Sequence, residues 1–324
     1  MIRQTKSAIS LFLLLLFLHS FSNKNISHWK NIGFEKSATK VNPRYQTFVK
    51  RKGDRTNRYI NCKMTNKELI DFFKKLFETN KRNIQRNTEN QKIPKIIHQI
   101  WLGSEFPDRY ATLANTWKNH HPDWEYKLWT EKELETFDMH NRDLFDQASN
   151  YAEKANILRY EILYQFGGLY VDTDFKCLKP FDILNESFEF YCGVETIRRQ
   201  VNISNALIGA IPKHPIMEYC VKKIKKNIDY WNELGFSEPL PWLPTCTRAG
   251  IFYFTKSFVT VTKRLNEEKR KKVIALPPSY LYPINLIRTG NSKGFYESFG
   301  IHLYDGTWFK KNKTHNQKSK KKKI

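Results

Sequence analysis

The feature that most constrains the fold is a helix that runs into a short strand and ends in two aspartates. An apolar stripe recurs at helical spacing along residues 151–166, and Gly167 and Gly168 supply the stop. Residues 169–174 then read as a strand that carries Asp172 and Asp174. Because side chains two apart on a strand leave the same face, the two carboxylates are expected to lie together.

The segments before this junction predict an α/β fold. Residues 95–103 form an apolar run ending in glycine, typical of a buried strand, and residues 125–129 form a second candidate strand. Residues 112–120 between them read as a helix. This order favours a mostly parallel sheet, in which ligands bind at the carboxyl ends of the strands. His98 sits inside the first strand and reads as an interior histidine.

The two aspartates point to cation chemistry. Carboxylates that converge at a strand end repel each other unless a cation lies between them. Oxygen ligands of this kind suit Mn²⁺ or Mg²⁺, with a diphosphate completing the coordination shell. Such an ion would neutralise the charge that develops on a departing phosphate. An Asp-x-Asp pair alone is weak evidence, but its place after this helix and glycine pair is far more specific.

Residues 93–103 and 156–174 resemble glycosyltransferase family 32, the sugar-binding-region DXD proteins. That family includes initiating α-1,6-mannosyltransferases and sphingolipid mannosyltransferases, and it is similar to the catalytic domain of large clostridial glucosylating toxins. The resemblance covers about residues 93–309. It implies a single Rossmann-like domain of the GT-A type, a nucleotide-sugar donor, a divalent metal, and transfer with retention at the anomeric carbon.

The resemblance also implies roles for particular residues. Trp101 would stack on the nucleotide base, and Arg159 would hold hydroxyls of the donor sugar. Asp172 would contact the ribose and reach the metal, while Asp174 would bind the metal directly. Position 156, commonly Asp in the family, is Asn156 here, so a donor contact keeps its hydrogen bonding but loses its charge.

Residues 301–308 are similar to the closing segment of the family, with threonine at position 307 where serine is usual. The resemblance implies that His302 or Asp305 completes the metal shell and that Trp308 covers the diphosphate or the glycosidic oxygen. Residues 204–210 are also similar to the family, and Asn205 is expected to face the sugar.

The net charge of +23 suggests a nucleic acid or an anionic membrane as partner until its location is considered. Residues 96–309 hold 26 basic and 26 acidic side chains, so the whole excess lies in the flanks. A neutral body without a recognition motif argues against binding to nucleic acid. The basic flanks leave contact with a membrane surface open.

The N-terminal region predicts targeting followed by a spacer. Residues 1–22 contain a ten-residue apolar core, which fits a signal peptide or a short membrane anchor. Residues 23–92 read as a basic, flexible stalk that carries an amphipathic helix at about 65–82, either packed on the body or docked on a membrane. Residues 310–324 read as a disordered lysine-rich tail. The catalytic domain is expected over 93–309.

These observations favour a metal-dependent retaining glycosyltransferase that moves a hexose from a UDP- or GDP-sugar to a glycan or lipid acceptor. A toxin-like effector that glycosylates a protein and a non-catalytic sugar-nucleotide-binding relative remain alternatives. The apolar N-terminus favours membrane association or the secretory pathway, as for a Golgi-type anchored enzyme, with secretion as the alternative. Four Asn-x-Ser/Thr sequons matter only in a glycosylating compartment. They are Asn25, Asn185, Asn202 and Asn312.

Overall fold

The structure is a computed structural model that describes residues 31–42, 59–85, 92–197, 200–236, 240–283 and 296–306. These residues belong to one compact unit within 31–324. The predicted signal peptide or anchor (1–22), the lysine-rich tail (310–324) and Trp308 lie outside the described residues. No helix of the described part of the chain is both long enough and apolar enough to cross a bilayer.

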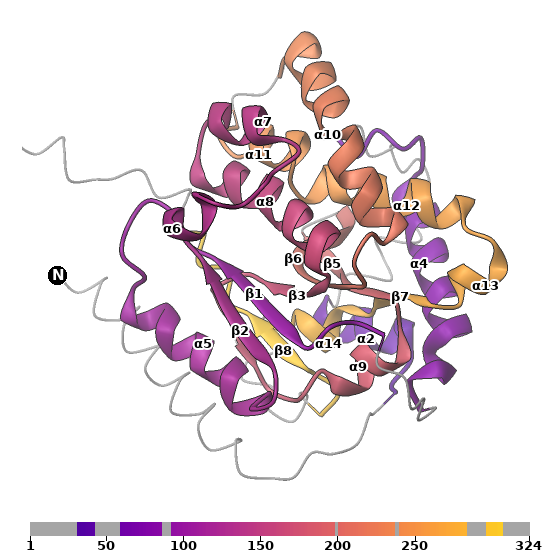
Figure 1. The fold of residues 1–324 in the computed structure, drawn as a ribbon. Coiled ribbons are helices and arrows are strands. Elements are labelled where there is room, and N and C mark those ends of the chain that lie inside the picture. The colour runs from indigo at the N-terminus through magenta and orange to yellow at the C-terminus, as the bar shows by residue number, and fades with distance from the viewer. Residues whose placement is uncertain are drawn as a thin grey trace, which may run out of the picture. The chain divides into compact units, whose positions relative to one another are not determined.

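A six-stranded sheet forms the centre of the molecule (Figure 1). Its strands lie in the order β2-β1-β3-β6-β5-β7. Their bounds are β1 Ile96–Ile100, β2 Glu125–Trp129, β3 Gly168–Val171, β5 Phe190–Ile197, β6 Gln200–Ala210 and β7 Val273–Leu276. Strand β6 runs antiparallel to both of its neighbours, while the other paired strands are parallel. The predicted α/β class with a mostly parallel sheet is therefore confirmed.

Helices cover both faces of this sheet, as Figure 1 shows. One side carries α8 and α10, and the other carries α5 together with a two-stranded ribbon of β4 and β8. The bounds in this region are α5 Asp108–His120, α8 Tyr151–Phe166, β4 Phe175–Cys177, α10 Pro215–Leu234, α12 Ile251–Arg264 and β8 Gly300–His302. The shorter helices are α6 Glu131–Leu134, α7 Arg142–Gln147, α9 Asp182–Ser187, α11 Leu243–Arg248, α13 Glu267–Arg270 and α14 Pro278–Leu281.

The glycine pair at the end of α8 is required by space as well as by backbone conformation. Gly167 and Gly168 have φ angles of 66° and 93°, in the left-handed region that side chains disfavour. A Cβ atom on Gly168 would lie 2.7 Å from the carbonyl oxygen of Ile96. The pair therefore lets α8 turn directly into β3, and that turn places Asp172 and Asp174 at the carboxyl edge of the sheet.

Two N-terminal helices pack on the domain, which differs from the predicted flexible stalk. Helix α2, Phe34–Val41, buries Phe34, Ala38 and Val41, and its Ser37 hydroxyl lies 2.8 Å from that of Ser279 in α14. These apolar positions recur at helical spacing, but only over two turns, so the pattern is short in the sequence. A short 3-10 helix, Lys81–Gln85, follows the second N-terminal helix, which is described next.

The second N-terminal helix is α4, Asn66–Asn80, which begins at a reciprocal capping box between Thr65 and Glu68. Its apolar face is buried beside β7 and α12, with the Phe73 ring 6.1 Å from that of Phe258. Each buried side chain of this size contributes about 1.5–3 kcal/mol. The sequence left open whether this helix packs on the body or docks on a membrane. In the structure it packs on the body.

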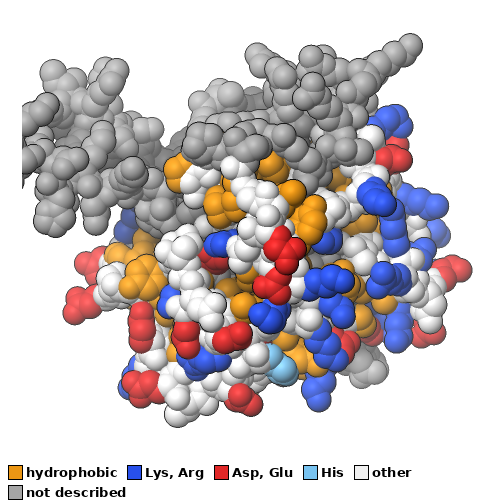
Figure 2. Space-filling model, turned by 90° about the horizontal axis from the view of Figure 1, so that it is seen from above, with side chains coloured by type: hydrophobic (Ala, Val, Ile, Leu, Met, Phe, Trp, Pro, Cys, Tyr) orange, Lys and Arg blue, Asp and Glu red, His pale blue; other side chains and the backbone are white. Residues whose placement is uncertain are grey.

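Figure 2 shows the charge distribution on one face of the molecule. Acidic and basic side chains are intermixed there, with Lys and Arg more frequent towards the right-hand side of the view. This mixture agrees with the balanced charge of residues 96–309.

Candidate active site

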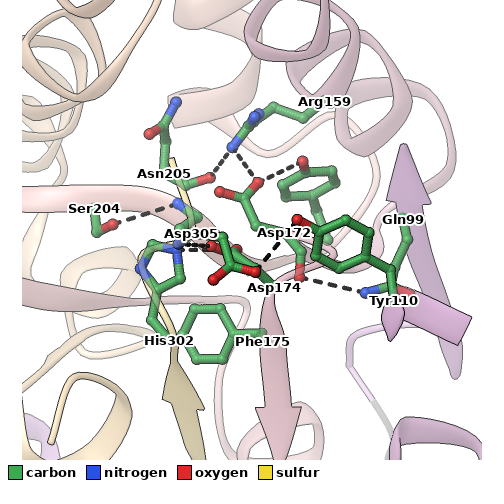
Figure 3. A network of polar contacts seen from close by, with 12 residues as sticks. Gln99, Tyr110, Arg159, Asp172, Asp174, Phe175, Ser204, Asn205, His302 and Asp305 are labelled. Atoms are coloured by element: carbon green, nitrogen blue, oxygen red, sulfur yellow. Dashed lines mark hydrogen bonds and ion pairs between the residues drawn. The ribbon is translucent and has the colours of Figure 1, made fainter. Parts of the chain in front are cut away.

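Asp172 and Asp174 lie at the carboxyl edge of the central sheet, directly after β3 (Figure 3). The strand ends at Val171, so the carboxylates are brought together by a turn rather than by strand alternation. The Phe175 N–H closes that turn by donating to the Asp172 carbonyl, at 3.1 Å. The predicted convergence is present, and its local cause is a tighter backbone than the sequence pattern indicated.

Arg159 projects from α8 onto Asp172. Its Nη1 donates to Asp172 Oδ1 at 2.9 Å and to the Asn205 carbonyl at 2.7 Å, and its guanidinium lies 4.4 Å from the centre of the Tyr170 ring. Burial raises the pKa of Asp172, although the Arg159 charge opposes that shift. One charged side chain thus joins the helix, the first aspartate and strand β6.

Asp174 is held by the C-terminal segment that contains β8. Its Oδ1 lies 3.1 Å from His302 Nε2, and its Oδ2 accepts the Asp305 backbone N–H at 2.9 Å. Burial disfavours the charge on Asp174, but His302 and the Asp305 N–H outweigh it and lower the pKa of this carboxyl. The second aspartate is therefore ionised in a nearly closed environment.

Asp172, Asp174 and His302 form a group that fits a divalent cation. One ligand atom from each residue lies within 4.8 Å of the others. Opposite ligands of an octahedral Mg²⁺ site are about 4.2 Å apart, so little movement is needed to surround an ion. Two carboxylates and an imidazole suit Mn²⁺ or Mg²⁺, and when bound such an ion would supply charge neutralisation for a leaving phosphate.

Strand β6 reaches this site through a large bulge. Cys192 pairs with Ile208, yet the next residue, Gly193, pairs with Ser204, so residues 205–207 have no partner on β5. On the other side Leu207 pairs with Val171 of β3, and the Ala206 carbonyl accepts the Asp172 N–H at 2.8 Å. Strand β6 is thereby bonded to the first aspartate.

Asn156 and Asn205, both expected to contact the donor sugar, bond to each other. Asn205 Nδ2 donates to Asn156 Oδ1 at 2.9 Å and to the Tyr160 hydroxyl at 3.2 Å. Both amides are buried beside Arg159. Where the family commonly has a carboxylate at position 156, this protein thus has two hydrogen-bonded amides. A sugar hydroxyl would have to share the hydrogen-bonding groups of that pair.

Trp101 lies at the end of β1 among aromatic side chains. Its ring centre is 4.9 Å from that of Tyr110, and its Nε1 donates to the Glu105 carbonyl at 3.0 Å. Gln99, two residues earlier, donates to the Asp172 carbonyl at 3.3 Å, which links the end of β1 to the DXD turn. A pocket of about 230 Å³ opens next to this loop, lined by Leu102, Glu131, Leu134, Glu135, Arg142, Phe145, Tyr151 and Lys154.

Sequence reasoning missed two partners of the site. The Tyr170 hydroxyl donates to Asp172 Oδ1 at 2.7 Å, a contact that the two-residue spacing on one strand face could have indicated. Asp305 is occupied by an ion pair with Arg109 of α5 at 2.5 Å, which no local pattern indicates. Asp305 contacts Asp174 through its backbone, and His302 rather than Asp305 joins the ligand group.

His98 is buried and hydrogen-bonded to Gly167 and Trp129, as expected of an interior histidine.

Comparison with known proteins agrees with this geometry. Residues 107–191, which include both aspartates, match the family described as "Glycosyltransferase sugar-binding region containing DXD motif". The chain therefore carries a DXD-type glycosyltransferase region, and the family resemblance seen in the sequence is confirmed.

Two curated relatives are named mannosyltransferases. Inositol phosphoceramide mannosyltransferase 2 of Schizosaccharomyces pombe is 30% identical over 222 residues, covering 67% of this chain and 58% of that protein. The initiation-specific alpha-1,6-mannosyltransferase of Candida albicans is 31% identical over 143 residues, covering 39% and 35%. The chain thus spans a little over half of the first relative and about a third of the second. Among solved structures, the PaToxG glycosyltransferase has a TM-score of 0.43 at 19% identity, covering 63% of this chain and 80% of its own.

Proposed function

We propose that the protein is a divalent-cation-dependent glycosyltransferase that moves a hexose from a nucleotide sugar to a lipid or glycan acceptor. The observation that carries this proposal is the convergence of Asp172, Asp174 and His302 on one point, beside a buried arginine. A cation held there would bind the donor diphosphate, and Arg159 and Asn205 would face its sugar. Resemblance to the family implies retention of configuration, which the product's anomeric signal would test.

The relatives' names favour a lipid acceptor. Inositol phosphoceramide mannosyltransferase is named for a membrane lipid, so a related activity would operate at a membrane surface. This supports a membrane-associated or secretory-pathway location with the N-terminal segment (1–22) as targeting signal or anchor. The relatives' names also favour mannose as the transferred hexose. A protein acceptor is the alternative to a lipid.

We assign the nucleoside of the donor to the pocket beside Leu102. The pocket beside Leu102 adjoins Trp101, which we assign to base stacking, and α8 leads from Tyr151 at the pocket to Arg159 at the aspartates. Eight residues of helix span about 12 Å. Trp308, outside the described residues, remains assigned to the diphosphate or glycosidic oxygen by resemblance alone.

The deciding experiment measures donor hydrolysis by the full chain with Mn²⁺ and four donors, UDP-glucose, UDP-galactose, UDP-N-acetylglucosamine and GDP-mannose. The full chain is needed because α2 and α4 bury apolar surface against the domain. Hydrolysis of one donor that is lost with EDTA and in Asp174→Asn supports the proposal. Nucleotide binding without turnover, with or without a lipid acceptor, would favour the non-catalytic alternative. Absence of nucleotide binding would contradict the assignment.

A further inference from the structure

The imidazole of His302 packs against two aromatic rings. The Phe175 ring lies parallel to it at 4.9 Å, with 2° between the planes, and the Tyr304 ring lies at 4.2 Å on a tilt of 38°. Figure 3 shows the resulting orientation, with one edge of the imidazole turned to Asp174. The plane of the ring is therefore set by packing. What remains to be fixed is which ring nitrogen carries hydrogen.

The opposite edge of His302 faces the protein interior. Nδ1 is buried and has no hydrogen-bond partner among the described residues. A histidine that binds a cation through Nε2 carries its hydrogen on Nδ1, and that N–H usually donates to a carboxylate, a carbonyl or a water. An uncompensated buried donor costs about 1–3 kcal/mol. The candidate cation site thus requires an acceptor on this side.

Glu195 is a buried carboxylate whose charge acts on His302. It is 3% exposed, and its Oε1 also has no hydrogen-bond partner among the described residues. Burial raises the pKa of Glu195, while the charge of His302 and the hydroxyls of Tyr304 and Ser204 oppose that rise. Glu195 Oε1 and His302 Nδ1 are therefore two buried atoms without a hydrogen-bond partner among the described residues, although the Glu195 carboxylate also interacts with the hydroxyls of Tyr304 and Ser204.

Glu195 leaves β5 on the same side as Gly193, two residues earlier. A Cβ atom on Gly193 would lie 2.6 Å from the Tyr282 ring, and that ring lies 6.0 Å from His302. Glu195 also lies directly across from Asn202. Side-chain atoms of Asn202 and the Tyr282 hydroxyl are likewise buried without partners in the described part of the chain. Tyr304 has a φ of 54°, a conformation that costs a non-glycine residue of order 1–3 kcal/mol. Such strain is retained where neighbouring contacts require it.

We propose that Glu195 is a positioning residue of the cation site, whose carboxylate accepts the Nδ1 hydrogen of His302 through one buried water and so turns the Nε2 lone pair to the cation. The other unpartnered groups of this cluster complete the water's hydrogen bonds, since buried waters make about three. This inference rests on the proposed function only in taking Asp172, Asp174 and His302 as the cation ligands.

The test is Mn²⁺ affinity of the full chain, measured by calorimetry and by electron paramagnetic resonance of free Mn²⁺, without donor or turnover. Glu195→Ala should bind Mn²⁺ on the order of 10- to 100-fold more weakly than the wild type. Glu195→Gln, whose amide oxygen can still accept the hydrogen, should recover most of the affinity. Glu161→Ala is the matched control, because Glu161 is a fully buried carboxylate that bonds His140 and Asn141 instead.

A spectroscopic measurement keeps the test independent of folding losses. In ¹⁵N-labelled protein with Mg²⁺, long-range ¹H–¹⁵N spectra should show His302 protonated at Nδ1, and Glu195→Gln should shift that signal. Unchanged affinity in folded Glu195→Ala, or His302 protonated at Nε2 with Mg²⁺ present, would overturn the role of Glu195 alone. If the wild type binds no Mn²⁺, the cation site itself is wrong, and this inference falls with it.

Discussion

His302 Nε2 lies 3.1 Å from Asp174 Oδ1 across 128 positions of sequence. The pairing of β4 with β8, which sets Phe175 opposite His302, holds this contact in place. When His302 is protonated, its Nε2 hydrogen faces Asp174 where a cation bound by both residues would lie. The protonated His302 is therefore an internal counter-charge for the DXD motif. Several predictions depend on the exchange of its proton for a cation.

Asp174→Asn should abolish cation-dependent donor hydrolysis. The amide keeps the size of the side chain but removes the charge that His302 and a cation both need. We expect activity to fall by a factor on the order of 10²–10³ or more, as for the loss of one electrostatic stabiliser. Initial rates with saturating Mn²⁺ give the effect. Asp123→Asn, which changes an exposed aspartate paired with Lys95, should keep wild-type rates; an equal loss in both variants would contradict the assignment.

Mn²⁺ affinity should rise with pH. Burial lowers the pKa of His302, but Asp174 and the other nearby carboxylates outweigh burial and raise the pKa to about 9. Below pH 9 a cation must displace the proton from His302. Mn²⁺ affinity is therefore expected to fall roughly tenfold for each unit by which the pH is lowered. Titrations between pH 6.5 and 8.5 test this slope, and His302→Asn should flatten it.

Without a cation, the same ion pair should make stability fall as pH rises. The folded pKa of His302, about 9, lies above its ordinary value of 6.5, so its contribution is complete below pH 6.5 and is lost towards pH 9. Thermal unfolding in EDTA should show a lower Tm at pH 9 than at pH 6.5, and the difference should shrink in His302→Asn. A Tm difference that persists in the variant would assign the pH dependence to other groups.

Arg159→Lys should not behave as a conservative change. The guanidinium donates to Asp172, to the Asn205 carbonyl and to the Ala155 carbonyl, and an ammonium group cannot reproduce that planar arrangement. Lysine keeps the charge but cannot make all of these hydrogen bonds from a buried position, and each buried group left without a partner costs about 1–3 kcal/mol. Both Tm and kcat/KM should fall. Arg270→Lys, which removes an arginine that donates to backbone carbonyls away from the site, should lower Tm alone.

Asn80→Ala should destabilise the whole domain although it changes the N-terminal region. Asn80 is buried at the end of α4, and its Nδ2 donates to the Arg270 and Val273 carbonyls at 2.9 and 2.7 Å. Two buried carbonyls left without donors cost about 1–3 kcal/mol each. Urea unfolding should show one transition shifted to lower midpoint. If the variant instead shows a separate unfolding transition at low urea and a main transition at the wild-type midpoint, α4 unfolds independently of the domain.

The sequons at Asn185 and Asn202 should remain unmodified in the folded protein. Both side chains are 1% exposed, and Asn185 is further bonded to the Tyr191 hydroxyl. Mass spectrometry of protein secreted from a glycosylating host gives the answer. Substantial glycan at Asn185 or Asn202 would show that modification precedes folding of α9 or of the β5–β6 region, respectively.

The sequence contained the centre of the site but not its surroundings. Asp172 and Asp174 lie two residues apart, so the strand pattern predicts that they converge, whereas the role of Arg159 was implied by the resemblance alone. His302 could be named only through resemblance, because its contact depends on β4 pairing with β8. The bulge at Asn205 and the burial of Glu195 come from a register shift between two strands, which no single-strand pattern records. Helix α2 was missed because two turns give too weak a periodic signal.

The packing of the N-terminal helices also sets an order of events during synthesis. Ser37 meets Ser279, 242 positions later in the chain. At about 5–20 residues per second, roughly 10–50 s pass between the appearance of α2 and that of its partner α14. During that interval α2 can pack on α4, as the Phe34 and Phe77 rings do at 6.4 Å, but not on α14. The N-terminal helices therefore reach their full native packing only after the chain has been made as far as α14.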